Sequence, residues 1–100
     1  MSNLAVANEI KNQLGGNRFA VMTGAKNFAG TENSLQFRIG GGAKKKISWV
    51  RITLMPDDTY KMEFFKIVKF EAIKVAEHTD VYCDMLQEIF TQETGFYTHL

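Results

Sequence analysis

The spacing of apolar residues predicts a short helix at the N-terminus, over residues 2–14. Leu4, Ala7, Ile10 and Leu14 fall on one face of that helix. Ser2 can cap its start. The glycines at positions 15 and 16 can end it, because glycine adopts the left-handed cap conformation at little cost.

The middle of the chain alternates between apolar and polar residues, which predicts strands over residues 19–23, 35–39, 47–55 and 59–65. Residues 24–34 are rich in Gly, Asn and Thr and predict a loop that contains Phe28. The residues expected on the core face of the last three strands are Leu35, Phe37, Ile39, Val50, Ile52, Leu54, Tyr60, Met62 and Phe64.

The last third of the chain predicts one more strand and a helix. Residues 66–77 fit either a helix or a strand, and their β-branched content favours a bend near Val68 followed by a strand over 70–76. Thr79 or Asp80 is expected to cap a helix that runs to about Thr94 and is ended by Gly95. The apolar stripe of that helix consists of Tyr82, Met85, Leu86, Ile89 and Phe90.

This order of elements predicts one α+β domain over residues 1–100, an antiparallel sheet of about five strands flanked by an N-terminal and a C-terminal helix. Hairpin-length connections favour antiparallel pairing. The sequence also argues against a membrane-spanning protein, since no apolar run approaches the roughly 20 residues of a membrane span. The single cysteine, Cys83, excludes an intramolecular disulfide, and the N-terminus carries no secretory signal pattern. We therefore expect a cytoplasmic location.

Charge is distributed unevenly along the chain, although the net charge is only +1. Residues 1–56 hold eight basic and two acidic residues, whereas residues 57–100 hold four basic and nine acidic ones. Such asymmetry indicates a charged partner or self-association, unless the two halves intermix in the fold.

Cationic side chains close to an aromatic residue form the most promising functional pattern. Phosphates attract cations, and single-stranded bases stack on aromatic rings. A glycine-rich loop over residues 40–46, expected to be flexible, ends in three lysines and leads into the strand that bears Trp49. Because this loop leads into a strand, it lacks the strand-to-helix context of a phosphate-binding loop. The residues predicted to bind nucleic acid are Lys26, Arg38, Lys44, Lys45, Lys46, Trp49 and Arg51.

Catalytic and metal-binding patterns are weaker. Cys83 and His78 are the best available thiol–imidazole pair, but the pattern is weak, and the simpler interpretation is that Cys83 is a helix residue and His78 a surface residue at a strand end. Asp57 and Asp58 could bind a hard cation with Asp80 or Asp84 if the fold brought them together, although a proline–aspartate turn explains the first pair. We expect neither an enzyme nor a cofactor or metal site.

A protein partner is the other open class. The C-terminal tail carries Phe96, Tyr97 and Leu100, and aromatic residues commonly anchor interfaces. Exposed strand edges can also pair with a partner or with a second copy, which would give a homodimer.

Several short motifs give the chain a family resemblance. They include residues 13–19 (QLGGNRF), residues 22–28 (MTGAKNF) and the ending Thr94–Gly95 with Tyr97–Thr98. Over about residues 12–100 the sequence resembles a family of small phage and mobile-element accessory proteins. The resemblance implies an accessory protein in a bacterial cytoplasm that acts on nucleic acid or on host machinery that handles it. It assigns no activity to individual residues.

Together these observations predict a non-enzymatic binding module of phage or mobile-element type. The leading hypothesis is nucleic-acid binding, single-stranded or duplex, through the basic loop and the sheet face of Trp49. The alternative is a protein-binding accessory factor that inhibits a host defence complex or nucleic-acid machinery.

Overall fold

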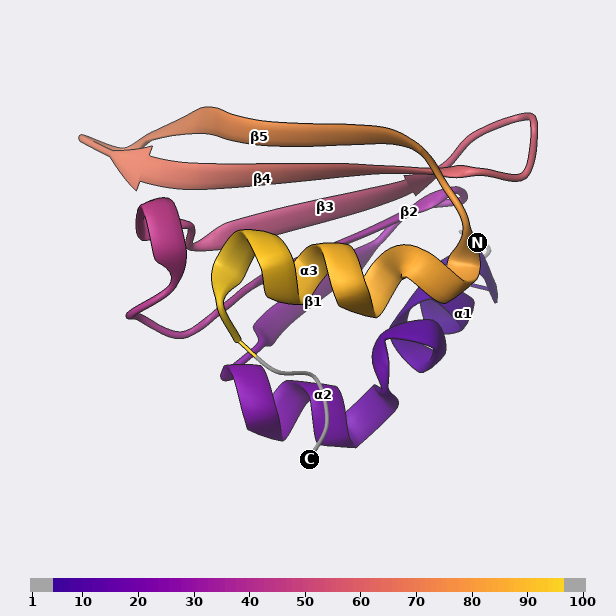
Figure 1. Ribbon diagram of the computed structural model, residues 1–100, viewed down its shortest axis with the longest axis horizontal. Coiled ribbons are helices and arrows are strands. Elements are labelled where there is room, and N and C mark those ends of the chain that lie inside the picture. Colours follow the sequence, from indigo (N-terminus) through magenta and orange to yellow (C-terminus); the bar gives the residue numbers. More distant parts are fainter. Residues whose placement is uncertain (1–4, 97–100) are drawn as a thin grey trace.

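The computed structural model describes residues 5–96, apart from the side chain of Asn17. A five-stranded antiparallel sheet has the strand order β1-β2-β3-β4-β5, so that each strand pairs with its neighbour in the chain. Three helices cover one face of this sheet (Figure 1). The elements are α1 (Ala5–Leu14), α2 (Gly16–Thr23), β1 (Lys26–Gly30), β2 (Ser34–Arg38), η1 (Lys44–Lys46), β3 (Trp49–Leu54), β4 (Tyr60–Val68), β5 (Glu71–Val81), η2 (Cys83–Met85) and α3 (Leu86–Thr94), where η marks a 3-10 turn. The predicted α+β class and the flanking helices are confirmed.

The core lies between the helices and the sheet and is centred on three aromatic rings. Phe19 of α2 meets Phe37 of β2 and Phe90 of α3 edge-on, with ring centroids 5.3 and 5.1 Å apart. All three side chains are fully buried. Most of the core-face residues predicted for β2, β3 and β4 are buried, and Leu54 packs partly buried against the same cluster.

The predicted strand over residues 19–23 is wrong, because this segment forms the second half of α2. Phe19 and Thr23, one helical turn apart, are both buried, whereas Val21 is 82% exposed. The Thr23 hydroxyl donates a hydrogen bond to the Phe19 carbonyl at 2.8 Å, and Gly24 ends the helix with a φ of +69°. Burial of the Phe19 ring in the core outweighs the strand preference of this short segment.

The predicted loop over residues 24–34 is also wrong in part, because it contains the edge strand β1. The pairing with β2 shifts between Lys26 and Ala29, and Asn27 has a φ of +56° at this bulge. Phe28 packs on Phe37 with a centroid distance of 5.4 Å. An edge strand with one core-facing ring has too little apolar content to be recognised by alternation.

The ambiguous stretch, residues 66–77, is strand, as favoured from its β-branched content. The bend lies at Lys69 and Phe70, slightly later than predicted, and forms a two-residue turn because Val68 pairs with Glu71. Strand β5 then runs on to Val81, well beyond the predicted end.

The start of the C-terminal helix is later than predicted. Thr79 and Asp80 belong to β5 and cap nothing, and Asp80 has a φ of +56° where the pairing with β4 shifts. Tyr82 and Met85, expected in the buried stripe, are 60% and 37% exposed because they precede α3. Gly95 ends α3 in the left-handed conformation, as predicted.

Candidate nucleic-acid interface

The sheet face opposite the helices carries a row of cationic and aromatic residues that crosses all five strands. Cross-strand partners point to the same side of a sheet. The pairing register therefore aligns, from β1 to β5, Lys26, Arg38, Trp49, Phe65 and Lys74. We call these five residues the cross-sheet row. Four strand spacings give it a length of about 19 Å.

Trp49 and Phe65 form the centre of the cross-sheet row. Their ring centroids are 4.6 Å apart with an interplanar angle of 32°. Phe65 is only 7% exposed and is unavailable to a ligand, whereas Trp49 is half-buried and leaves part of its ring open. The Arg51 guanidinium lies 5.9 Å from the Trp49 ring and 5.5 Å from the Phe65 ring.

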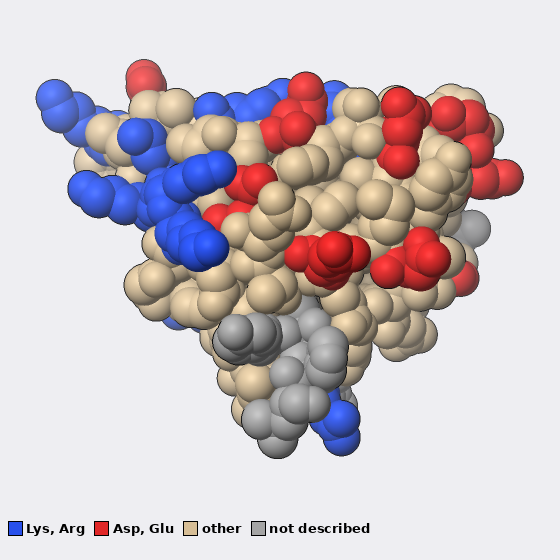
Figure 2. Space-filling view, viewed as in Figure 1, with Lys and Arg blue, Asp and Glu red and all other residues tan. Residues whose placement is uncertain are grey.

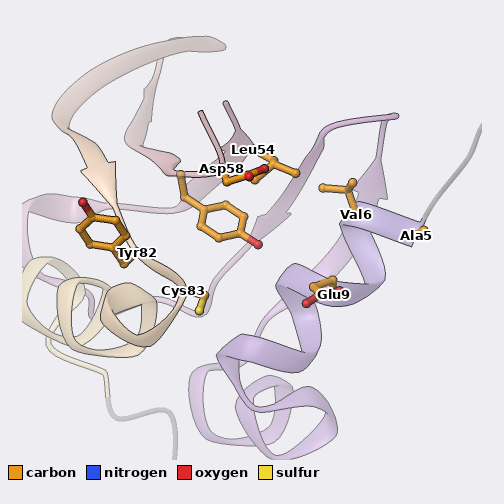
Figure 3. Close-up of a pocket in the computed structure, with 8 residues that line it drawn as sticks. Ala5, Val6, Glu9, Leu54, Asp58, Tyr82 and Cys83 are labelled. Carbon is orange, nitrogen blue, oxygen red and sulfur yellow. The ribbon is translucent and has the colours of Figure 1, made fainter. Parts of the chain in front are cut away.

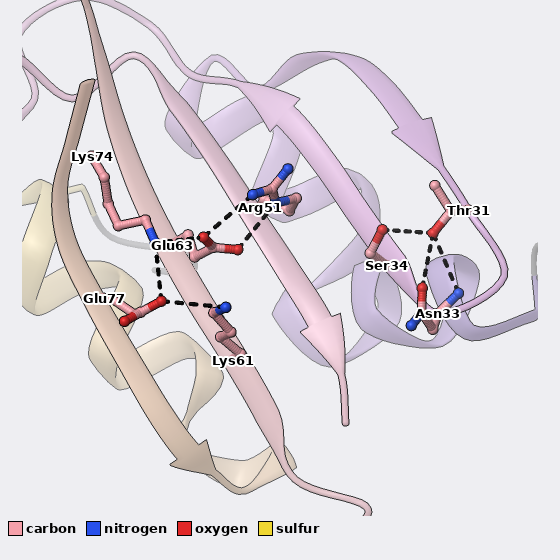
Figure 4. A network of polar contacts seen from close by, with 8 residues as sticks. All are labelled: Thr31, Asn33, Ser34, Arg51, Lys61, Glu63, Lys74 and Glu77. Atoms are coloured by element: carbon pink, nitrogen blue, oxygen red, sulfur yellow. Dashed lines mark hydrogen bonds and ion pairs between the residues drawn. The ribbon is translucent and has the colours of Figure 1, made fainter. Parts of the chain in front are cut away.

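An ion network next to the row already engages Arg51 (Figure 4). Glu63 accepts hydrogen bonds from Arg51 Nε at 3.1 Å and Arg51 Nη2 at 3.3 Å, and Lys74 Nζ lies 2.9 Å from the same carboxylate. Glu77 lies 3.1 Å from Lys74 Nζ and 3.4 Å from Lys61 Nζ. Arg51 was predicted to bind nucleic acid, but its charge is largely compensated by Glu63.

Burial raises the pKa of the Glu63 carboxyl, but hydrogen bonds from Arg51 and Lys74 outweigh burial and hold the pKa below its ordinary value. The pKa of Glu77 is lowered by hydrogen bonds from Lys74 and Lys61. Both carboxylates are therefore charged at neutral pH, and the network is strongly ionic.

The three lysines expected on a flexible loop form the 3-10 turn η1, which packs against α3. Lys45 Nζ lies 2.8 Å from Glu93 Oε2, and the pKa of Glu93 is lowered mainly by this hydrogen bond. A side chain at Gly95 would come within 3.2 Å of the Lys44 stem, so the turn and the end of α3 are in close contact. The three lysine residues remain exposed.

These features gather at one end of the molecule. The segment with η1 joins Arg38 to Trp49, so the lysine turn lies beside the cross-sheet row while wrapping to the helix side. Figure 2 shows Lys and Arg side chains concentrated at the left, around η1 and the β4–β5 turn, and acidic ones toward the right. We define the basic end as Lys26, Arg38, Lys44, Lys45, Lys46, Trp49, Lys66, Lys69 and Lys74. Charge is therefore unevenly distributed in space, although the basic end includes Lys66, Lys69 and Lys74 from the acidic half of the sequence.

Backbone strain is concentrated at the same end. Among the non-glycine residues that the structure describes, seven have positive φ values, a conformation that is rare for residues with a Cβ. Five of them belong to the basic end or adjoin it, namely Asn27, Lys45, Lys46, Lys69 and Phe70. Strained backbone persists where the surrounding structure enforces it, and it clusters at functional sites.

The thiol–imidazole hypothesis gains no support. His78 Nε2 lies 3.0 Å from Glu93 Oε1, and its ring meets Phe64 edge-on at 6.2 Å. Cys83 is exposed and lines a different region, a cavity of about 410 Å³ beside Tyr60 and Tyr82 (Figure 3). Burial raises the pKa of Tyr60, assisted by the negative groups nearby.

The structure also shows where the candidate metal ligands and the first residue of the C-terminal tail lie. Within residues 5–96 no three His, Cys, Asp or Glu side chains are grouped to hold a metal ion. The Asp57 carboxylate instead accepts hydrogen bonds from the Thr59 hydroxyl at 2.6 Å and the Thr59 amide at 3.2 Å, which lower its pKa. Phe96 is half-buried against the core. Tyr97 and Leu100 lie outside the described residues.

Neither a protein-family model, nor a curated protein, nor a solved structure matches this chain. None of the helices described in residues 5–96 is long and apolar enough to cross a membrane. The geometry of the basic end is therefore the basis for a functional assignment. Three of its members, Lys66, Lys69 and Lys74, could not be predicted from the sequence, because their place depends on the β4–β5 pairing.

Proposed function

We propose that this protein is a binding module that binds nucleic acid through its basic end. The observation that carries the proposal is the cross-sheet row, in which a partly open tryptophan is bracketed by cationic residues across five paired strands. A row of about 19 Å spans roughly five base-pair steps of 3.4 Å along the axis of a duplex.

The cations have distinct roles in this proposal. Lys26 and Arg38 have no salt-bridge partner among the described residues, so their charges are available to phosphates. Lys45 forms a salt bridge with Glu93 that positions the turn, whereas Lys44 and Lys46 form no salt bridge within residues 5–96 and present their charges beside the row. Trp49 supplies the aromatic surface on which a base stacks.

The protein's only tryptophan makes the test direct, because Trp49 alone reports on the site. Labelled single-stranded DNA, duplex DNA and RNA are titrated with the protein at about 50 and 200 mM salt, and fluorescence anisotropy is recorded with Trp49 emission. We expect binding that weakens steeply with salt and changes Trp49 emission.

Matched variants locate the site. The double variant Lys44→Gln/Lys46→Gln should reduce the slope of log K against log salt concentration by roughly two units if both lysines contact phosphates. Arg18→Gln, on the exposed surface of α2, removes a charge elsewhere and is the control. The proposal is overturned if no nucleic acid binds at low salt, or if Arg18→Gln weakens binding as much as Arg38→Gln.

A further inference from the structure

The β4–β5 hairpin projects from the basic end as a two-stranded ribbon. Strand β3 begins at Trp49, which pairs with Phe65, so residues 66–73 have no third strand beside them. Figure 1 shows this ribbon extending past η1 and past the helices. Three residue pairs beyond Phe65 give it a reach of roughly 10 Å.

The tip of the ribbon is strained and apolar. Lys69 and Phe70 form its two-residue turn with φ values of +50° and +68°. Such turns favour Asn-Gly, because both positions need positive φ. Phe70 is 103% exposed, and Ile67, Val68 and Ile73 are each 40% exposed. The core of the described structure thus gains nothing from an aromatic residue in this unfavourable conformation.

The surroundings of the tip indicate what covers it. Lys66 and Lys69 flank the apolar residues, η1 and the cross-sheet row lie at the base of the ribbon, and the one acidic side chain in the ribbon is Glu71. A partner that fits is anionic outside and apolar inside. Base pairs stacked between two phosphate backbones have this character, and apolar side chains that enter between base pairs are an established way to kink a duplex.

We propose that the β4–β5 ribbon is a DNA-bending arm that inserts Phe70 between adjacent base pairs of duplex DNA. This inference rests on the proposed function and specifies its ligand as a duplex. The basic end holds the phosphates on both sides of the kink, and the energy of the extra contacts offsets the unstacking. An A-form RNA duplex is a poorer ligand, because its deep and narrow major groove and its shallow minor groove differ from those of DNA.

The test uses duplex DNA of about 20 base pairs with a donor and an acceptor dye at its two ends. The wild-type protein is expected to raise energy transfer by bending the duplex by about 20–90°. Phe70→Gly is expected to remove this rise and to weaken binding about tenfold, within the range for losing one aromatic–base stack. Phe70→Leu, which keeps an apolar wedge, is expected to restore part of the bend.

Stability measurements separate lost function from lost folding. Phe70→Gly relieves the left-handed strain at an exposed site, so its Tm is expected to rise by roughly 5 °C. Val21→Ala removes another highly exposed apolar side chain, on α2, and is expected to change neither bending nor affinity.

Each outcome has a separate meaning. If Phe70→Gly binds and bends the duplex as the wild type does, the proposed bending role of the ribbon is wrong, whereas the proposed nucleic-acid binding is unaffected. Salt-sensitive binding to single strands alone also overturns the arm and keeps the proposed function. If no nucleic acid binds, both proposals fail. Attachment to vesicles of anionic phospholipid, lost in Phe70→Gly, with no duplex bending, would assign the tip to a membrane surface instead and overturn the inference.

Discussion

Glu63 lies at the centre of the ion network on the open sheet face, and its replacement by glutamine should affect folding strongly. Glu63 is 4% exposed, and its carboxylate accepts two hydrogen bonds from Arg51 while Lys74 Nζ lies 2.9 Å away. Hydrogen bonds to charged groups contribute about 1.5–3 kcal/mol each. The side chains of Arg51 and Lys74 are 38% and 41% exposed, so solvent screens them and the total is smaller than the sum. We expect Glu63→Gln to destabilise the protein by about 2 kcal/mol, or roughly 10 °C in Tm.

The effect should depend on pH with a definite sign. The folded-state pKa of Glu63 lies below that of an unfolded glutamate, which is about 4.3. The stabilisation is therefore fully present above about pH 5 and is lost as the pH falls through the folded-state pKa. The Tm difference between the wild type and Glu63→Gln should shrink on acidification.

Thermal unfolding at pH 7 and in acid, followed by circular dichroism, provides the measurement. Glu77→Gln is the matched control, because Glu77 belongs to the same network but is 39% exposed, so solvent screens its ion pairs and it should contribute less than Glu63 does. Equal Tm values for the wild type and Glu63→Gln at pH 7 would refute the reasoning. A decrease in Tm as large in Glu77→Gln as in Glu63→Gln would refute it as well. Because Glu63→Gln also releases the charge of Arg51 beside Trp49, it should tighten nucleic-acid binding while weakening the fold.

Three further predictions concern the core, a backbone contact and the thiol. Phe90→Ala should cost about 3–5 kcal/mol in urea unfolding, since the ring is fully buried against Phe19, and a loss below 1 kcal/mol would contradict this packing. Gly24→Ala should destabilise clearly, because a Cβ there would come within 3.2 Å of the Gly40 backbone at a φ of +69°, whereas Gly41→Ala meets open space and should leave Tm nearly unchanged. Alkylation of the exposed thiol of Cys83 should leave nucleic-acid affinity unchanged in the anisotropy assay, and a large loss would return this cysteine to the functional site.

The central strands of the fold could be predicted because their own residues determine them. In β2, β3 and β4 the apolar residues that face the core occupy every second position, so this pattern is visible in the sequence, although Glu63 and Phe65 on the open face of β4 are buried as well. Phe19 shows the limit of this reasoning. Its neighbours also alternate, but a five-residue window fits either period, and the choice depends on Phe37 and Phe90, which are distant in sequence.

In the candidate site, too, features set by local alternation could be predicted, whereas those that depend on distant residues could not. Trp49 and Arg38 could be assigned to one face from strand alternation alone, and the structure places them as cross-strand neighbours. That Glu63 would compensate Arg51, or that Glu93 would hold Lys45, could not be read from the chain, because these pairs depend on register and on helix docking. The roles of Lys66 and Phe70 could not be predicted either, since these residues are exposed only because the β4–β5 hairpin extends beyond the start of β3.

The neighbour-to-neighbour order of the five strands has a consequence for how the chain folds. Each hairpin closes a short loop, so the sheet can assemble from contacts that are local in sequence, and such topologies fold fast for their size. The long-range step is the docking of α2 and α3, whose Phe19 and Phe90 come from opposite ends of the chain. The sheet can therefore form from contacts between neighbouring segments, but part of its inner face stays uncovered until α3, the last helix in the described chain, docks on it.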